Sequence, residues 1–167
     1  PLGLLLAENS TPEKIQELVG LDWDFLIFGL QTPLDMLSKE KTGKILKIAS
    51  SFTPTLVRAI NELSFPIDAV VIAYNNSRVT VEQLITCQLF AGLLNKPLLQ
   101  NVDSSISSSE LSNLHGAGVK GIILPEGTSL KAFAELIKSI GSLPKVSKRK
   151  TGTGALLPRL SIQTETN

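Results

Sequence analysis

The sequence predicts an α/β fold in which about six βα units form one parallel sheet. Short apolar runs rich in Leu, Ile and Val alternate with longer segments of helical period almost to residue 143. These runs are continuous rather than strictly alternating, which is typical of strands that are buried on both faces of a parallel sheet. Helix-start signals also recur along the chain, each of them after an apolar run.

Six apolar runs are predicted to be the strands: residues 2–7, 24–29, 44–49, 68–73, 97–102 and 120–125. Thr-Pro steps at positions 11–12, 32–33 and 53–54 each supply a capping hydroxyl and a residue preset for the first helical turn. The residue spacing of a capping box predicts three helix N-termini, at Ser10–Glu13, Thr80–Gln83 and Ser107–Glu110. Helix ends are expected near the glycines at positions 20, 116 and 118, where a left-handed residue is easily accommodated.

Successive βα units imply right-handed crossovers, so the sheet is either an open doubly wound sheet or one curled toward a TIM barrel. The barrel is favoured because no strand is followed by a glycine-rich dinucleotide fingerprint and because the units look alike. A closed barrel needs eight units and typically ~250 residues. The predicted domain is therefore TIM-barrel-like and incomplete, with the open doubly wound sheet as the alternative.

Composition indicates one domain followed by a basic tail. The chain has 167 residues, of which 43% are hydrophobic, enough for one well-cored domain over residues 1–144. Residues 145–167 carry five basic side chains against Glu165, a net charge of +4, which leaves −3 for residues 1–144. The tail is interpreted as flexible, or as a segment that docks on a protein partner or another copy through Leu156, Leu157 and Leu160.

Several classes of partner are not expected. The body lacks the basic face with aromatic platforms that a nucleic-acid surface needs. The longest apolar stretch, residues 84–99, is broken by polar residues and Pro97, so no membrane span is predicted. Cys87 is the single cysteine, which rules out an intrachain disulfide and leaves the cytoplasm as the default location. The chain starts at Pro1, which suggests that its natural N-terminus was processed or lies upstream.

The stretch "NLHGAGVKGIILPEG", residues 113–127, resembles the strand entry of phosphate-binding TIM barrels and of metal-dependent hydroxy-acid aldolases, in which an Ala-Gly-Val-x-Gly run leads into a late strand. The resemblance covers about fifteen residues. The whole chain is also similar to uncharacterised bacterial barrel-like proteins, for which no activity is assigned. The aldolase resemblance implies carboxylates that converge on a metal ion.

In both architectures ligands bind at the carboxyl ends of the strands, so the candidate residues lie in the strand-to-helix loops. Glu8, Asp103 and Glu126 each follow a different strand and are the candidate ligands of one Mg²⁺ or Mn²⁺ ion. The alternative is that Asp103 caps the next helix while Glu8 and Glu126 are solvated.

Two further sets of residues are candidates. Lys47, within a strand expected to be covered on both faces, is a candidate imine-forming lysine, or else an edge lysine that prevents aggregation. A small phosphate or carboxylate is expected to bind the most polar loop and a second helix start, at Tyr74, Asn75, Asn76, Arg78, Gly127 and Thr128. The alternative for both segments is ordinary turn chemistry.

The usual nucleophiles and bases are not expected to act. His115, the single histidine, precedes Gly116 in a helix-to-strand connection on the opposite face, and Cys87 lies in a largely apolar helix.

Two functional hypotheses remain. The chain is a non-catalytic scaffold or subunit of an assembly, slightly favoured because no strong catalytic constellation is present, or a lyase or aldolase barrel acting on a small phosphorylated or carboxylated substrate.

Overall fold

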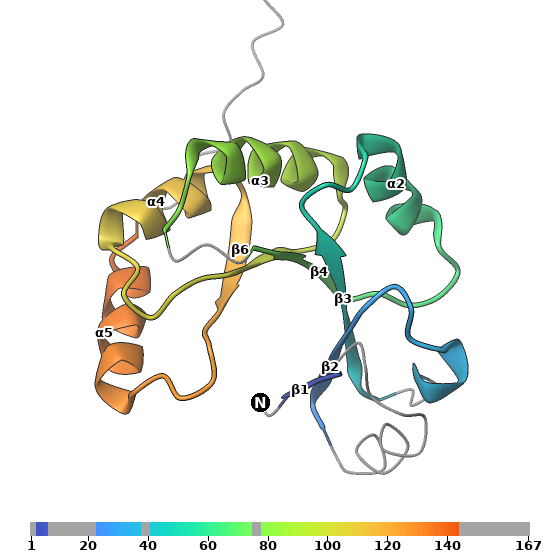
Figure 1. The fold of residues 1–167 in the computed structure, drawn as a ribbon, viewed down its shortest axis with the longest axis horizontal. Helices are drawn as coiled ribbons and strands as arrows, with labels where there is room; N and C mark the ends of the chain where they lie inside the picture. Colours follow the sequence, from blue (N-terminus) through green and yellow to red (C-terminus); the bar gives the residue numbers. More distant parts are fainter. Residues whose placement is uncertain (1–2, 7–22, 38–40, 75–77, 144–167) are drawn as a thin grey trace, which may run out of the picture.

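The computed structural model describes residues 3–6, 23–37, 41–74 and 78–143. Six parallel strands form one curled sheet in chain order: β1 Gly3–Leu5, β2 Phe25–Phe28, β3 Gly43–Ala49, β4 Ala69–Ala73, β5 Leu98–Asn101 and β6 Val119–Ile123 (Figure 1). The strand order never reverses, so the sheet lacks the switch point of a doubly wound fold. The prediction of an incomplete TIM-barrel-like fold is confirmed, and the open doubly wound alternative is wrong.

The helices lie along the convex side of the curled sheet (Figure 1). They are α2 Pro54–Ala59, α3 Val81–Leu93, α4 Ser108–Gly116 and α5 Leu130–Gly141, with short 3-10 turns η1 Leu34–Leu37 and η2 Ile60–Glu62. When each strand adds beside the previous one through a right-handed crossover, every helix falls on the same face of the sheet. This leaves the other face as the inside of a half barrel.

The predicted strands agree with the observed ones within two residues at every described boundary. Three helix starts are confirmed by their caps. The Thr53 hydroxyl accepts a hydrogen bond from the Leu56 amide at 3.4 Å, with Pro54 as the first helical residue. Complete capping boxes at Thr80–Gln83 and Ser107–Glu110 open α3 and α4. The start signals at Ser10–Glu13 and at positions 11–12 lie outside the described residues, as does Gly20.

The helix-start signal at Thr32-Pro33 precedes a 3-10 turn, η1 Leu34–Leu37. The residues at positions 38–40 that follow it lie outside the described residues. Met36 and Leu37 are buried, whereas Leu34 is 66% exposed, so this turn packs on the core through two adjacent residues.

The hydrophobic core lies between the sheet and the helices. Alternate strand residues such as Ile48 and Ile72 point to the helices and are at most 1% exposed, and Val57 and Phe90 fill the layer from α2 and α3. Burial of this face supplies the main stabilisation of the fold.

The inner face of the sheet is less enclosed than the sequence predicted. Ile45 and Lys47 of β3 and Leu99 of β5 are only half-buried there, and Leu5 of β1 is 58% exposed. The expectation that every strand is covered on both faces is therefore corrected. The cause is the incomplete barrel, because a closed barrel fills its interior with side chains from all eight strands.

Gly118 makes the turn from α4 into β6. Its φ of 97° is left-handed, and a Cβ at this position would lie 2.6 Å from the Cβ of Ala91 in α3. Gly116, the other glycine expected at this helix end, lies inside α4, and a Cβ added there would meet no neighbouring atom within 4 Å. Of these two glycines, only Gly118 needs to be glycine, for backbone conformation and for close packing alike.

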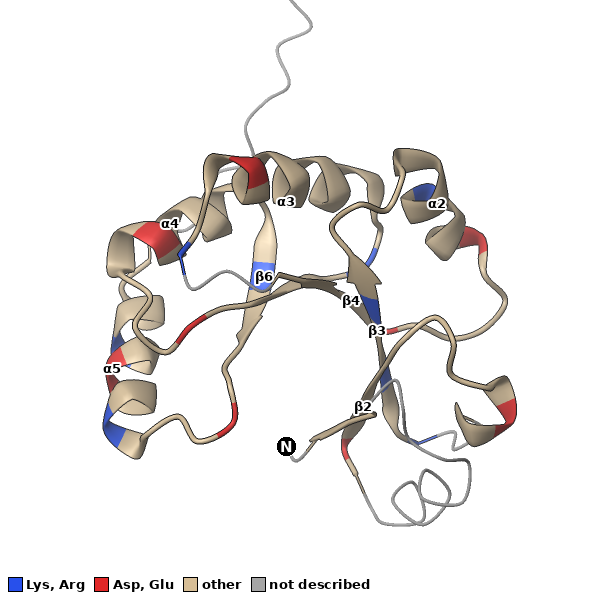
Figure 2. Cartoon of the chain, viewed as in Figure 1, with Lys and Arg blue, Asp and Glu red and all other residues tan. Residues whose placement is uncertain are grey.

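The described helices include none that is long and apolar enough to cross a membrane. Charges of both signs are scattered over the helices and loops, and the loops that follow β5 and β6 carry acidic residues (Figure 2). The tail of residues 145–167 lies outside the described residues.

Candidate functional site

The loops at the carboxyl ends of the strands hold most of the predicted site residues. Because all six strands are parallel, their carboxyl ends lie at one edge of the sheet. Asp103 follows β5 and Glu126 follows the neighbouring β6, so the topology brings these two carboxylates to the same part of that edge. Glu8, Asn75 and Asn76 lie outside the described residues.

Asp103 organises its own loop. Its Oδ1 accepts hydrogen bonds from the Ser105 amide at 2.8 Å and the Ser105 hydroxyl at 2.7 Å. These two bonds, the hydroxyl first, hold the pKa of Asp103 below its ordinary value of 3.8. The carboxylate is thus ionised and fixes a turn ahead of α4, whereas the alternative interpretation expected it to cap that helix. The cap of α4 itself is Ser107.

The carboxylates that could bind a divalent cation do not form a preassembled cluster in the part of the chain that the structure describes, where no three His, Cys, Asp or Glu side chains converge. Glu126 is exposed on the loop after β6. Oxygen ligands of this kind suit Mg²⁺ or Mn²⁺, which usually retain several waters and need only one or two carboxylates. Carboxylate oxygens such as those of Asp103 and Glu126 are therefore chemically suitable ligands for Mg²⁺ or Mn²⁺.

The turn after β6 is held by its own hydrogen bonds. The Thr128 hydroxyl donates to the Pro125 carbonyl at 2.7 Å, and Gly127 adopts a φ of 80° in the same turn. Ser129 then caps α5 by accepting a hydrogen bond from the Ala132 amide at 3.2 Å. The positions of Gly127 and Thr128 are thus explained by turn chemistry, with the Thr128 proton already donated.

Lys47 and Tyr74 lie on opposite faces of the sheet. Lys47 is on the inner face, paired with Val71 of β4. Tyr74, which follows β4, packs against the core between the sheet and the helices. Its hydroxyl is buried, and no described residue lies in hydrogen-bonding geometry with it. Burial raises the pKa of Tyr74 above its ordinary value of 10.0, so the phenol is neutral.

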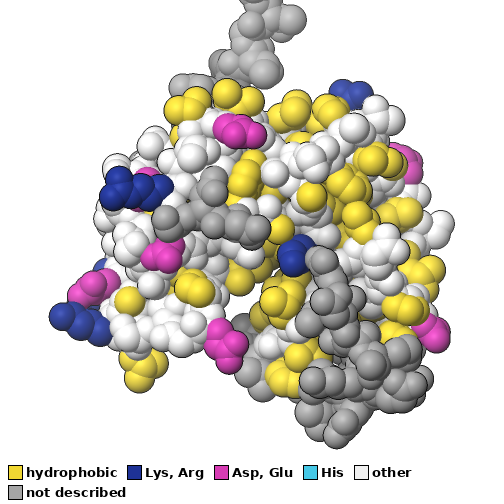
Figure 3. Space-filling model, viewed as in Figure 1, with side chains coloured by type: hydrophobic (Ala, Val, Ile, Leu, Met, Phe, Trp, Pro, Cys, Tyr) yellow, Lys and Arg dark blue, Asp and Glu magenta, His cyan; other side chains and the backbone are white. Residues whose placement is uncertain are grey.

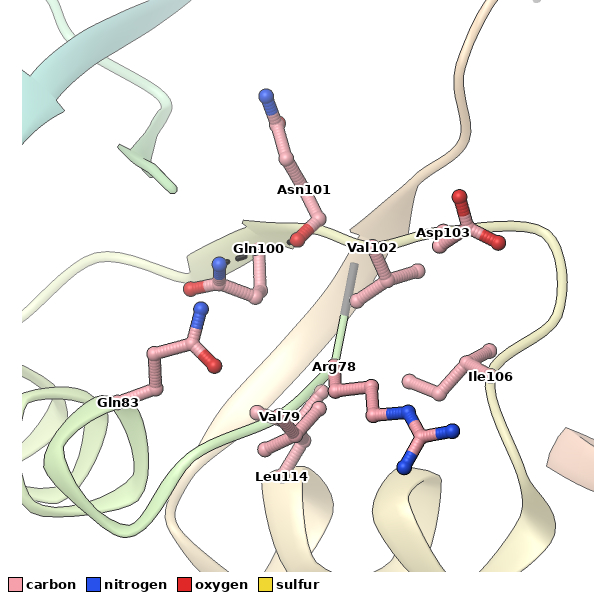
Figure 4. A pocket seen from close by; sticks show the side chains of 9 residues that line it. All are labelled: Arg78, Val79, Gln83, Gln100, Asn101, Val102, Asp103, Ile106 and Leu114. Atoms are coloured by element: carbon pink, nitrogen blue, oxygen red, sulfur yellow. Dashed lines mark hydrogen bonds between the residues drawn. The ribbon is translucent and has the colours of Figure 1, made fainter. Parts of the chain in front are cut away.

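A small cavity lies between the sheet and α3 and α4 (Figure 4). Its volume of about 10 Å³ has room for roughly one water molecule. Substrate pockets are of the order of 300 to 1,000 Å³, so this cavity is a packing feature and not a substrate site. Its walls come from two loops, β5, α3 and α4: Arg78, Val79, Gln83, Gln100, Asn101, Val102, Asp103, Ile106 and Leu114.

Two buried glutamines beside this cavity were not predicted. Gln83 and Gln100 are 4% and 2% exposed, and their amide groups point toward one another in Figure 4. Gln100 accepts a hydrogen bond from the Cys87 thiol at 3.4 Å and donates to the Asn101 carbonyl at 3.0 Å. The sequence gives little signal for this contact, because Cys87 and Gln100 lie in different elements and neither segment shows that the two side chains meet.

Cys87 is a buried structural thiol, as expected. It is 0% exposed, and burial raises its pKa to about 11. A thiol with this pKa is almost entirely protonated at neutral pH, so it is a poor nucleophile. His115 lies in the last turn of α4, away from the carboxyl ends of the strands, as predicted.

Glu110 connects the loop before α3 to the start of α4. One carboxylate oxygen accepts from the Val79 amide at 3.2 Å, and the other accepts from the Ser107 amide at 2.9 Å and the Ser107 hydroxyl at 2.6 Å. The Ser107 hydroxyl contributes most to a pKa below the ordinary 4.5, and the amides of Ser107 and Val79 and the charge of Arg78 lower it further. Arg78 itself is exposed.

We expect Glu110→Gln to lower the free energy of unfolding at neutral pH. The loss should become smaller at acidic pH. A carboxylate with a lowered folded-state pKa contributes stability above its unfolded pKa, and this contribution is lost as the pH falls through the folded value. The melting temperatures of wild type and variant should therefore differ most at pH 7 and converge below pH 4.5. A difference that stays constant from pH 7 to pH 3 would contradict this role.

The fold and its loops define a half barrel of the TIM-barrel type, with the strand-end loops as the candidate site. The chain is similar to FabK from Thermotoga maritima, with a TM-score of 0.53 and 15% identity over 74% of this chain and 40% of that one. A point mutant of the same FabK gives a TM-score of 0.54 and 14% identity over 73% and 42% of the two chains. No protein-family model and no curated protein matches the sequence. These similarities support the fold alone, and the chain spans about two fifths of FabK.

Proposed function

We propose that this chain is a non-catalytic scaffold or a subunit of an assembly. The observation that carries the proposal is that two outer helices present apolar stripes to solvent. On α3, Val81, Ile85 and Leu89 are 73%, 62% and 45% exposed at intervals of four residues. On α5, Leu130, Phe133, Ile137 and Ile140 are 43% to 87% exposed. Apolar patches of several hundred Å² on a protein surface typically mark interaction sites.

The α3 stripe lies opposite a face that is already buried. Cys87 and Phe90 of α3 are in the core, so the helix is apolar on two sides. A helix that is apolar all round is normally buried in a complete structure. Figure 3 shows hydrophobic side chains along the outer surface of α2 and α3. A shallow groove of about 440 Å³ runs along α3, lined by Ile85, Gln88, Leu89, Gly92 and Leu93.

The partner is a second copy of the chain or another protein. The tail of residues 145–167 is included in this proposal: its basic cluster steers association, and its apolar Leu156, Leu157 and Leu160 are buried on the partner.

The second candidate is a lyase or aldolase that acts on a small phosphorylated or carboxylated substrate. It is favoured by the position of Asp103 and Glu126 after neighbouring strands at one sheet edge. In this proposal Glu8, Asp103 and Glu126 hold Mg²⁺ or Mn²⁺, which would polarise a carbonyl or phosphoryl oxygen, or Lys47 forms an imine. The anionic group of the substrate is held by Asn75, Asn76, Arg78 and the turn at Gly127 and Thr128, whereas Tyr74 packs against the core.

One set of melting and mass measurements separates the two candidates. For an assembly, we expect the melting temperature to rise with protein concentration and the mass by light scattering to exceed 17.9 kDa. Deletion of residues 145–167 is expected to weaken the assembly. The assembly proposal also predicts that Mg²⁺, Mn²⁺ and a panel of small phosphates and oxo-acids leave the melting temperature unchanged.

The opposite pattern favours the enzyme. A ligand at a hundred times its dissociation constant adds about 2.7 kcal/mol, which raises the melting temperature by several degrees. A metal-dependent rise that is lost in Asp103→Ala, from a protein of 17.9 kDa at every concentration, would contradict the assembly. Borohydride trapping of a carbonyl substrate on Lys47 would also contradict the assembly and favour the enzyme.

A further inference from the structure

The apolar stripe of α5 is narrow and regular. Leu130, Phe133, Ile137 and Ile140 are 87%, 50%, 53% and 43% exposed, and their spacing of three, four and three residues is that of a helix-pairing seam. At 100° per residue, the charged side chains of Lys131, Glu135 and Lys138 lie on the opposite side of the helix. The stripe is therefore free of charge along its whole length.

The position of α5 leaves this stripe accessible. α5 packs on α4 and is the last described helix of the arc, with no described helix on its other side (Figure 1). The face that α5 turns toward the rest of the domain is a different one, marked by the buried Leu136. In a closed barrel the flank of each outer helix is covered by the next βα unit, so the exposed stripe follows from the incomplete arc.

The spacing of the stripe is the same in both directions along the helix. The pair Leu130 and Ile140 and the pair Phe133 and Ile137 are both centred on position 135. A second α5 that lies antiparallel across a two-fold axis thus places Leu130 against Ile140 of the second copy and Phe133 against Ile137 of the second copy. Two-fold contacts of this self-complementary kind are the commonest interfaces of homo-oligomers.

The apolar area is close to what a dimer needs. A standard interface buries about 800 Å² per partner, of which about 60% is apolar. With side chains of roughly 150 to 200 Å² each, the exposed parts of the four stripe residues come to roughly 400 Å². The stripe alone supplies most of the apolar area of a standard interface.

We infer that two copies of this chain dimerise through antiparallel pairing of their α5 helices, with the Leu130, Phe133, Ile137 and Ile140 stripes in contact. This inference rests on the proposed function, because it names the surface and the partner of the assembly. The second copy is favoured by the symmetric spacing, the absence of charge on the stripe and the area available.

The test compares two matched substitutions by sedimentation velocity over a range of protein concentrations. Ile137→Glu places a charge at the centre of the α5 stripe, and we expect it to raise the dimer dissociation constant about 100-fold or more. Ile85→Glu makes the same change at a similarly exposed position of α3, 62% against 53%, and is expected to leave the dimer intact. Circular dichroism melts confirm that both variants fold.

The outcomes separate this inference from the proposed function. A wild-type chain that is monomeric at every concentration overturns both. A wild-type dimer that is lost in Ile85→Glu, or on deletion of residues 145–167, but kept in Ile137→Glu overturns the α5 contact and leaves the assembly standing.

Disulfide cross-linking tests the direction of pairing. Phe133→Cys and Ile137→Cys are made in separate chains and mixed under mild oxidation, while Cys87 is buried and 0% exposed. Antiparallel pairing predicts that the mixed cross-link between the two variants forms faster than either variant links to itself. Faster self-linking of Phe133→Cys would indicate parallel helices and overturn the two-fold arrangement.

Discussion

Phe90→Ala is expected to lower the free energy of unfolding by about 3 to 5 kcal/mol, which is a large part of the stability of a domain of this size. Phe90 is 1% exposed and is the largest of the fully buried side chains of the described core. Its ring packs in the layer between α3 and the sheet, where truncation leaves a cavity that rigid strands cannot fill. Urea denaturation at low protein concentration measures the change.

Leu89→Ala is the matched control for this substitution. Leu89 is the preceding residue of the same helix but is 45% exposed. We expect its truncation to cost less than about 1 kcal/mol, since surface substitutions generally have small effects. Equal losses for the two variants would show that α3 is not packed on the sheet as described.

Gly118→Ala is the second substitution with a large expected effect, a loss of about 2 to 4 kcal/mol. The added methyl group imposes a left-handed strain at a φ of 97° and meets the Cβ of Ala91 at 2.6 Å. The contact lies between β-carbons, so relief requires a backbone shift of α3 or of the α4–β6 turn. Thermal and urea unfolding both report the loss.

Gly116→Ala should act in the opposite direction. Gly116 lies within α4, its φ is not left-handed, and a Cβ there meets no atom within 4 Å. Alanine in a helix is more favourable than glycine by about 0.5 to 1 kcal/mol, so a small gain in stability is expected. A loss at Gly116 as large as that at Gly118 would contradict the assignment of the helix end.

Local signals in the sequence were sufficient for the elements of the fold. Continuous apolar runs identified the six strands, and hydroxyl caps located the starts of α2, α3 and α4, because both depend on interactions within a few residues. The Thr32-Pro33 step shows a limit of such signals: it marks where a helical turn begins, here the 3-10 turn η1, but not which type of turn follows.

The candidate site was less predictable. The positions of Asp103 and Glu126 in strand-end loops followed from the βα pattern, but the pairing of Asp103 with Ser105 and of Thr128 with Pro125 depends on loop conformation. The buried contact between Cys87 and Gln100 joins residues of α3 and β5, and nothing in either segment by itself specifies it.

The sequence by itself determined a parallel α/β domain with capped helices, a buried unreactive cysteine and no strong catalytic constellation, since periodicity, capping and residue chemistry are local properties. Only the tertiary structure decided that the strands lie in sequential order, that the inner face of the sheet is partly open, and that α3 and α5 each keep an apolar stripe in solvent. The physical reason is that periodicity shows which residues of a helix are apolar, whereas the packing of neighbouring elements determines which of them are covered.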